Sequence, residues 1–286
     1  MRLDGRRESS NVDDHRRMGG GGKATLGIGG LIIVALITWF MGGNPMSVLQ
    51  NVDLSSVTTS QQSSRELTPE EEELAKFSRQ ILAGTEDVWT KVFKQYGRTY
   101  QPPKMVLFTG SVQTACGGAT SQVGPFYCSA DESLYIDLSF FSEMRQSLGA
   151  DGDFAYAYVI AHEVGHHVQH LLGTLDKAHT QMAKMSEADS NRMSVRIELQ
   201  ADFYAGVWAY HDNQMFGSLE PGDLEDAINC AAVIGDDYLQ KKARGYAVPE
   251  SFNHGTSQQR QKWLTLGLRT GDLTKGDTFS LSYSDL

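Results

Sequence analysis

Residues 159–173 read VIAHEVGHHVQHLLG, and this stretch carries the strongest structural signal in the chain. His162 and His166 are four residues apart, so on a helix their side chains share a face, one turn apart. Glu163 follows the first histidine. In this H-E-x-x-H arrangement two imidazoles hold zinc and the glutamate acts as general base. Apolar residues on both sides predict a largely buried helix over about 153–172.

A second interpretation of this stretch is a helix whose polar face carries histidines without a ligand, since His166 and His170 are also four apart. Buried imidazoles without partners are costly, which favours the metal site. Gly165 lies inside the predicted helix, where glycine costs about 1 kcal/mol relative to alanine. A close approach by another backbone or by a ligand would explain it. His167 and His170 are predicted to be ordinary helix residues.

A catalytic zinc usually takes three protein ligands and leaves one position for water. Residues 196–206 read RIELQADFYAG, in which Glu198 and Asp202 are one helical turn apart beside an apolar stripe. We therefore expect Glu198 to be the third ligand. Asp202 can accept the free N–H of a ligand imidazole, which would fix its tautomer. The other possible third ligands are Glu187, His170, His179 and His211.

A polar cluster later in the chain, HGTSQQR at 254–260, has the pattern of a helix start, with Thr256 or Ser257 as the N-cap. His254 stands just ahead of this helix. It is a candidate hydrogen-bond donor to the oxyanion of a tetrahedral intermediate.

The rest of the residues from 68 onward predict an α+β domain over 68–286, mostly helical with a small β-sheet. Thr68-Pro69-Glu70 marks the start of the first helix, which continues to about Tyr96. Strands are expected at 105–110 and 133–140, and the latter could line the cleft and pair with an extended peptide. Further helices are expected at about 186–211, 222–243 and 256–268.

The N-terminal region predicts a membrane anchor, since residues 24–43 contain no charge and are long enough to span a bilayer. A cleaved signal peptide is the alternative. Basic residues cluster in the tail 1–23 and are absent between the span and Arg65, so the positive-inside rule places the N-terminus in the cytoplasm. Residues 44–67, rich in Ser, Thr and Gln, predict a flexible tether. The domain would then lie in the periplasm, held at the inner membrane by a single-pass helix.

Three cysteines are present, and export to an oxidising compartment favours a disulfide between Cys116 and Cys128, with Cys230 unpaired. Three free thiols are the alternative. The formal net charge of -10 argues against a nucleic-acid partner.

Several segments together resemble one bacterial family, the neutral zinc metallopeptidases, and more narrowly its membrane-anchored YpfJ-type group. They are HEVGHHVQ (162–169), ELQADFYAGVW (198–208) and SFNHGTSQQR (251–260), with CGGATSQVGPFYC and LYIDLSFF. The resemblance implies a zincin-like metalloprotease domain with zinc on His162 and His166 and with Glu163 as base. Likeness to glutamate-zincins supports Glu198. His254 and Arg260 are similar to a His-to-Arg motif late in HtpX-like membrane peptidases.

Taken together, these features predict a membrane-anchored Zn²⁺ peptidase that hydrolyses peptide bonds in a peptide or protein substrate. Zinc-activated water would attack the carbonyl and Glu163 would take the proton. Two other functions fit the same residues. One is an inactive metal-binding scaffold of the cell envelope, and the other is a metallohydrolase that acts on non-peptide amides.

Overall fold

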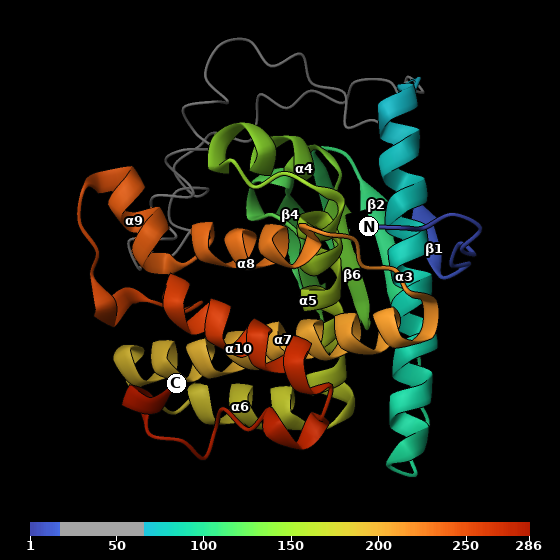
Figure 1. Ribbon diagram of the computed structural model, residues 1–286. Helices are drawn as coiled ribbons and strands as arrows, with labels where there is room; N and C mark the ends of the chain where they lie inside the picture. The colour runs from blue at the N-terminus through green and yellow to red at the C-terminus, as the bar shows by residue number, and fades with distance from the viewer. Residues whose placement is uncertain (18–65) are drawn as a thin grey trace.

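The computed structural model describes residues 1–17 and 66–286 (Figure 1). Within these residues, four short strands form a mixed sheet in the order β1-β2-β6-β5. β1 (Val12–Asp14) and β6 (Ser133–Asp137) both run parallel to β2 (Lys104–Phe108), and β5 (Phe126–Cys128) runs antiparallel to β6. A hairpin of β3 (Ser111–Thr114) and β4 (Gly117–Thr120) stands apart from this sheet.

Helices make up most of the described chain, which confirms the predicted mostly helical α+β class. The N-caps expected from sequence are present: Thr68 and Thr256 each form a capping box. The helices are α3 (Pro69–Gln95), α4 (Ser139–Glu143), α5 (Asp153–Leu171), α6 (Thr174–Met182), α7 (Glu187–Phe216), α8 (Asp223–Val233), α9 (Asp236–Arg244) and α10 (Ser257–Thr270). Short helical turns lie at Ser121–Val123, Met144–Leu148, Pro249–Ser251, Leu273–Lys275 and Tyr283–Asp285.

Helix α5, which carries the H-E-x-x-H motif, lies at the centre of the core and packs against α7. Gly165 allows this approach, because a Cβ there would lie 2.9 Å from the carbonyl oxygen of Ala201 on α7. The close backbone contact predicted at Gly165 is thus confirmed. Helix α7 in turn meets α10 through Gly206 and Gly267, where a Cβ on either glycine would overlap the opposite backbone. These contacts fix the three helices relative to one another.

Two sequence predictions about elements are wrong. The helix expected over 222–243 is broken into α8 and α9, because the backbone of Gly235 is extended (φ -69°, ψ 143°). Only glycine fits there, since a Cβ would lie 2.4 Å from the backbone nitrogen of Ser257. The strand expected over 133–140 ends at Asp137 and lies between β2 and β5, so both of its backbone edges are paired. It cannot pair with an extended peptide; β5 is the strand at that edge of the sheet.

Residues 1–17 do not form a tail separate from the domain. β1 adds to the sheet beside β2, and the Arg16 side chain is only 2% exposed, with its guanidinium bonded to Asp14 and to the backbone oxygen of Glu71. The first 17 residues of the predicted tail (1–23) thus pack on the predicted domain (68–286). The cause is that the basic side chains read as a cytoplasmic charge cluster instead pair with carboxylates of the domain.

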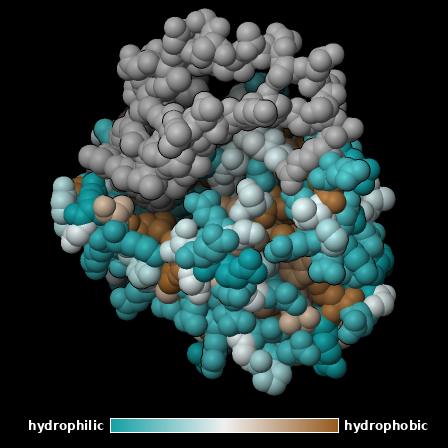
Figure 2. Space-filling model, turned by 90° about the horizontal axis from the view of Figure 1, so that it is seen from above, coloured by the Kyte–Doolittle hydropathy of each residue, from teal (hydrophilic) through white to brown (hydrophobic). Residues whose placement is uncertain are grey.

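The membrane helix predicted at 24–43 and nearly all of the tether at 44–67 lie outside the described residues. In the parts of the chain that the structure describes, no helix combines the length and apolar character needed to cross a bilayer. The disulfide between Cys116 and Cys128 is present, and Cys230 is free and buried, which confirms both predictions. The disulfide ties the β3–β4 hairpin to β5. Seen from above, the visible described surface is mostly hydrophilic, with hydrophobic patches between (Figure 2).

Candidate metal centre

Three potential metal ligands converge where α5 packs on α7. The Nε2 atom of His162 lies 3.1 Å from Oε2 of Glu198, and the Nε2 atom of His166 lies 3.5 Å from Oε1 of the same carboxylate. Among residues 1–17 and 66–286, this is the one group of three or more His, Cys, Asp or Glu side chains with ligand atoms close enough to hold a metal ion together. All three side chains are largely buried, at 8%, 12% and 15% exposure.

The tautomers of the two imidazoles suit a metal. Nδ1 of His162 lies 2.7 Å from Oδ1 of Asp202, and a carboxylate can only accept, so Nδ1 carries the proton. Nδ1 of His166 donates to Oε1 of Gln169, whose amide is oriented by its own donation to the backbone oxygen of Ile197. Both Nε2 atoms therefore face the Glu198 carboxylate, and a bound cation would take the place of the proton that His162 otherwise shares with it. Two neutral imidazoles and one carboxylate are a donor set that fits Zn²⁺.

A buried network supports His162 from behind. The Arg260 guanidinium forms two hydrogen bonds with Asp202, Nε to Oδ2 and Nη2 to Oδ1, both at 2.9 Å. The Tyr158 hydroxyl donates to Oδ1 of Asp202 at 2.6 Å. Burial alone would raise the pKa of Asp202, but Arg260 and His162 outweigh it and lower the pKa to about 2. Asp202 therefore stays ionised and holds the ring of His162 in place.

The charged groups of the centre shift one another's pKa values strongly. Burial, with a smaller contribution from Glu198, raises the pKa of Glu163 to about 8. Burial lowers the pKa of His166 to about 4 despite the nearby Glu198 carboxylate. For His162, burial opposes the charged form, but Asp202 and Glu198 raise the pKa to about 10. Such opposed shifts among neighbouring groups are typical of functional sites.

His254 lines a cavity together with the three potential ligands, and Asp236 at the start of α9 holds its ring in place. One carboxylate oxygen of Asp236 accepts the backbone N–H groups of Asn253, His254 and Gly255 at 2.7–2.9 Å, and the other accepts from Nδ1 of His254 at 3.1 Å. Burial opposes the charge on His254, yet Asp236 raises its pKa. The ring is thereby fixed and favoured as a hydrogen-bond donor.

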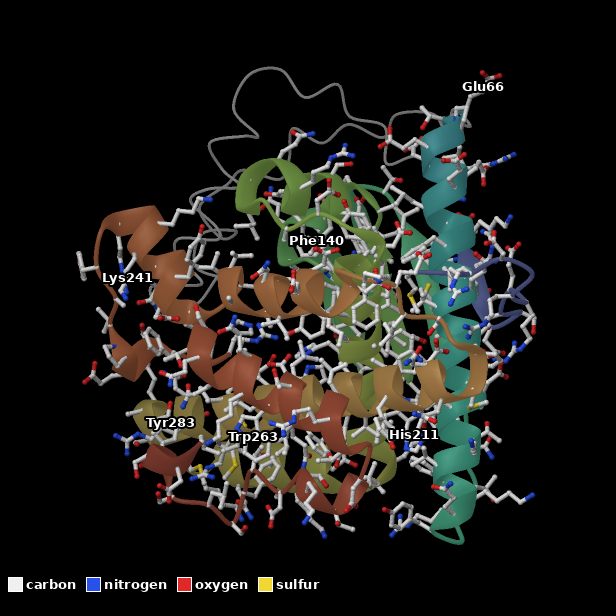
Figure 3. The ribbon with its side chains drawn as sticks, viewed as in Figure 1. Glu66, Phe140, His211, Lys241, Trp263 and Tyr283 are labelled. Carbon is white, nitrogen blue, oxygen red and sulfur yellow. A yellow bond between two sulfur atoms is a disulfide. The ribbon has the colours of Figure 1, made fainter. Side chains whose placement is uncertain are left out.

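The other candidate ligands lie elsewhere. Glu187 is at the exposed start of α7, His170 contacts Asp176 and Glu132, and Nε2 of His211 lies 2.9 Å from the backbone oxygen of Gly271. Figure 3 shows His211 well separated from Phe140, which lines the cavity. His179 lines the same cavity but is not among the clustered ligand atoms.

Sequence reasoning missed three residues that shape the centre: Tyr158, Gln169 and Asp236. Gln169 could have been found, because it lies one helical turn after His166 on α5. Tyr158 likewise lies one turn before His162. Asp236 gives no such signal, since it is 18 residues from His254 and reaches it only through the fold.

A cavity of about 650 Å³ opens onto the centre and is lined by His162, Glu163, His166, Glu198 and His254. Arg260 also lines this cavity, and the apolar side chains that line it include Phe140 of α4 and Leu175 and Met182 of α6. Buried titratable groups at the wall of one such cavity are the usual arrangement of an active site.

The chain matches the family model described as "Putative neutral zinc metallopeptidase" over residues 1–279. It belongs to this family. Members are zinc metallopeptidases by description, which makes Zn²⁺ the expected cofactor, and the three converging side chains provide a site for it.

Similar proteins occur in distant bacteria. The uncharacterized protein YpfJ of Escherichia coli (strain K12) is 50% identical over 296 aligned positions, which cover 99% of this chain and 100% of that protein. An uncharacterized protein of Mycobacterium tuberculosis (strain H37Rv) is 46% identical over 203 positions, which cover 68% of this chain and 66% of that protein. No solved structure matches this chain.

Proposed function

We propose that the chain hydrolyses peptide bonds in a peptide or protein substrate as a glutamate-zincin, with zinc held by His162, His166 and Glu198. The observation that carries this proposal is the convergence of three ligand atoms while both imidazoles are held through Nδ1. Zinc in such a site lowers the pKa of a bound water to about 7 and polarises a carbonyl. Asp202 and Arg260 keep His162 oriented for this role.

The proton transfers fall to Glu163, which lies next to His162 on α5 and lines the same cavity. Its carboxylate takes a proton from the attacking water and passes it to the leaving amine. Burial raises the pKa of this carboxyl, and the charge of a bound zinc ion would lower it again, so that the carboxylate can accept a proton from the water. His254, fixed by Asp236, donates a hydrogen bond to the oxyanion that forms on the substrate.

Zinc content and peptide turnover of the full-length chain in detergent test the proposal. Glu163→Gln should keep one zinc per chain and lose about 10²–10⁴-fold in turnover, the usual contribution of a general base. Glu198→Ala should lose zinc. Glu187→Gln, at the exposed start of α7, is the matched control and should change neither.

Each contrary outcome points to another function. Wild-type chain that holds zinc but hydrolyses no peptide and no other amide would favour the metal-binding scaffold. Turnover of amides other than peptides, with peptides left intact, would favour the non-peptide metallohydrolase. Full activity of Glu163→Gln would exclude this glutamate as the base.

A further inference from the structure

The cavity beside the metal centre has two apolar walls. Phe140 and Leu148 contribute from the α4 side, and Leu175, Met182 and Ile197 contribute from the α6 side. In Figure 1, α4 and α6 lie toward opposite ends of α5, so the apolar lining extends to two sides of the metal centre. Phe140, Leu148 and Met182 are only partly buried. A ligand side chain that packs on either wall would therefore remove apolar surface from water.

The same cavity offers little that would recognise a chain terminus. An enzyme that removes C-terminal residues needs an accessible cation for the free carboxylate. Among the described lining residues, Arg260 is the one Arg or Lys, and its guanidinium is engaged by Asp202 in the buried network. The His254 imidazole, whose pKa is raised, is in turn paired with the Asp236 carboxylate. Outside the metal centre, Glu143 is the one carboxylate among the described lining residues that could attract a free amino terminus.

From these two observations we infer that the site cuts internal peptide bonds beside a large apolar residue, such as Phe or Leu. This inference rests on the proposed peptidase function and adds its substrate class. Burial of apolar surface supplies the binding, at about 25 cal/mol per Å² removed from water. Cleavage within a chain then needs no charged group for either terminus.

A set of peptides with acetylated N-termini and amidated C-termini tests this inference with the zinc-loaded full chain. The peptides differ at one central position, occupied by Phe, Leu, Ala, Asp or Lys. We expect kcat/KM for Phe and Leu to exceed that for Ala by at least tenfold, with internal cleavage beside that residue in mass spectra. Equal rates for all five, or cleavage that requires a free terminus, would overturn the inference.

Variants of the two walls make the test specific. Phe140→Ala and Met182→Ala should each reduce the preference for Phe over Ala at least threefold while zinc content stays at one per chain. Leu224→Ala is the matched control, because Leu224 is 41% exposed and is not among the lining residues. Unchanged preference in both wall variants would also contradict the inference.

Binding separates this inference from the proposed function. The zinc-loaded Glu163→Gln variant should bind the blocked Phe peptide at least tenfold more tightly than the blocked Ala peptide, measured by fluorescence anisotropy. If no peptide is hydrolysed by the wild type but this difference is found, the peptidase proposal fails and the apolar recognition stands. If peptides are hydrolysed without the difference, only the inference fails.

A different observation supports a second inference, which concerns residues 1–17. The Arg6 side chain crosses α3 at Gly84 and reaches α7. There its guanidinium donates to both carboxylate oxygens of Asp212, at 2.7 and 3.3 Å. Gly84 of α3 makes room for it, because a Cβ there would lie 2.7 Å from Nη2 of Arg6. Asp212 is fully buried. Removing residues 1–17 would leave this carboxylate without its cation.

Another buried contact lies further along the same segment. The Ser9 hydroxyl donates to Oε1 of Glu86 at 2.5 Å, and the side-chain amide of Asn11 donates to the same oxygen at 2.8 Å. β1 then pairs with β2 from Val12 to Asp14. We infer that residues 1–17 and the domain lie on the same side of any membrane to which the chain is attached. A single crossing between them, as the basic residues suggested, would separate β1 from β2.

Site-specific labelling in intact cells tests this topology. Asp13→Cys on β1 and Lys104→Cys on β2 replace exposed side chains that form an ion pair at 3.1 Å. A membrane-impermeant maleimide should label both variants or neither, with wild type as the background control. Labelling of one alone would refute the inference. A short bis-maleimide reagent should join the two cysteines of the double variant, because the two side chains lie on the same face of adjacent strands. Absence of this cross-link would refute the contact itself.

Discussion

Removal of the Arg260 guanidinium should destabilise the domain and weaken zinc binding together. Arg260→Met keeps an apolar stem of similar length but leaves Asp202, a carboxylate with no solvent exposure, without its cation. Breaking a buried ion pair from one side costs about 3–5 kcal/mol, because the remaining charge stays desolvated. Loss of a contact that orients a ligand histidine typically lowers metal affinity about 10–100-fold.

Part of that cost should be recovered by a second substitution. Asp202→Asn alone leaves the Arg260 charge buried, whereas the double variant with Arg260→Met leaves neither charge. We therefore expect the double variant to be less destabilised than the sum of the singles by more than about 1 kcal/mol. Arg192→Met is the matched control, since Arg192 is 59% exposed and lies 3.9 Å from Asp189. An exposed pair of this kind is worth at most about 1 kcal/mol.

The measurement is the free energy of unfolding of the full-length chain in detergent, from urea titration with and without a zinc chelator. In the samples with chelator, the change in unfolding free energy reports the cost of the broken ion pair alone. The difference between samples with and without chelator reports how much zinc binding stabilises the fold. Strict additivity in the chelated samples, or a cost for Arg260→Met no larger than for Arg192→Met, would refute the argument.

Three further changes follow from the fold. Gly165→Ala should cost about 1–3 kcal/mol in unfolding free energy, because its Cβ would press on the Ala201 backbone; wild-type stability would contradict the close contact. Cys116→Ser should cost about 3 kcal/mol by loss of a short disulfide loop, and reductant should then have no further effect. Although burial opposes this, hydrogen bonds from Arg16 lower the pKa of Asp14. The stabilisation is therefore present above the ordinary aspartate pKa of about 3.9 and is lost as the pH falls through the lowered pKa. Asp14→Asn should lack that loss in acid titrations of stability.

The one-turn spacing of His162 and His166, and of Glu198 and Asp202, was enough to predict that the members of each pair share a helix face. That the two faces meet depends on the packing of α5 against α7, so the sequence left other third ligands open. Gly165 was similarly informative, since a glycine inside a buried helix needs a packing reason. The contact between Asp236 and His254 could not be predicted from sequence. It depends on the end of α8 before Gly235 and on the packing that brings His254 back to the start of α9, and neither has a local sequence signal.

The N-terminal region shows the opposite case, in which a strong local pattern was misleading. The basic residues near the start fit the positive-inside rule, yet Arg6 and Arg16 are buried or nearly buried against carboxylates. β1 is three residues long and has no alternation that would predict a strand. β1 pairs with the edge of β2 opposite β6, and this contact between distant parts of the chain has no signal in the sequence of β1 itself. The inferred topology, with residues 1–17 and the domain on one side of the membrane, rests on these contacts and not on the charge pattern.

The contribution of β1 has a practical consequence for recombinant work. A fragment that begins near residue 66 would leave the outer edge of β2 with unpaired backbone groups, which is a template for self-association. Aggregation of such a fragment would say nothing about the intact protein. A synthetic peptide of residues 1–17, added in trans, should cap the edge and restore solubility. Affinity tags are accordingly better placed at the C-terminus than ahead of the strand that closes the sheet.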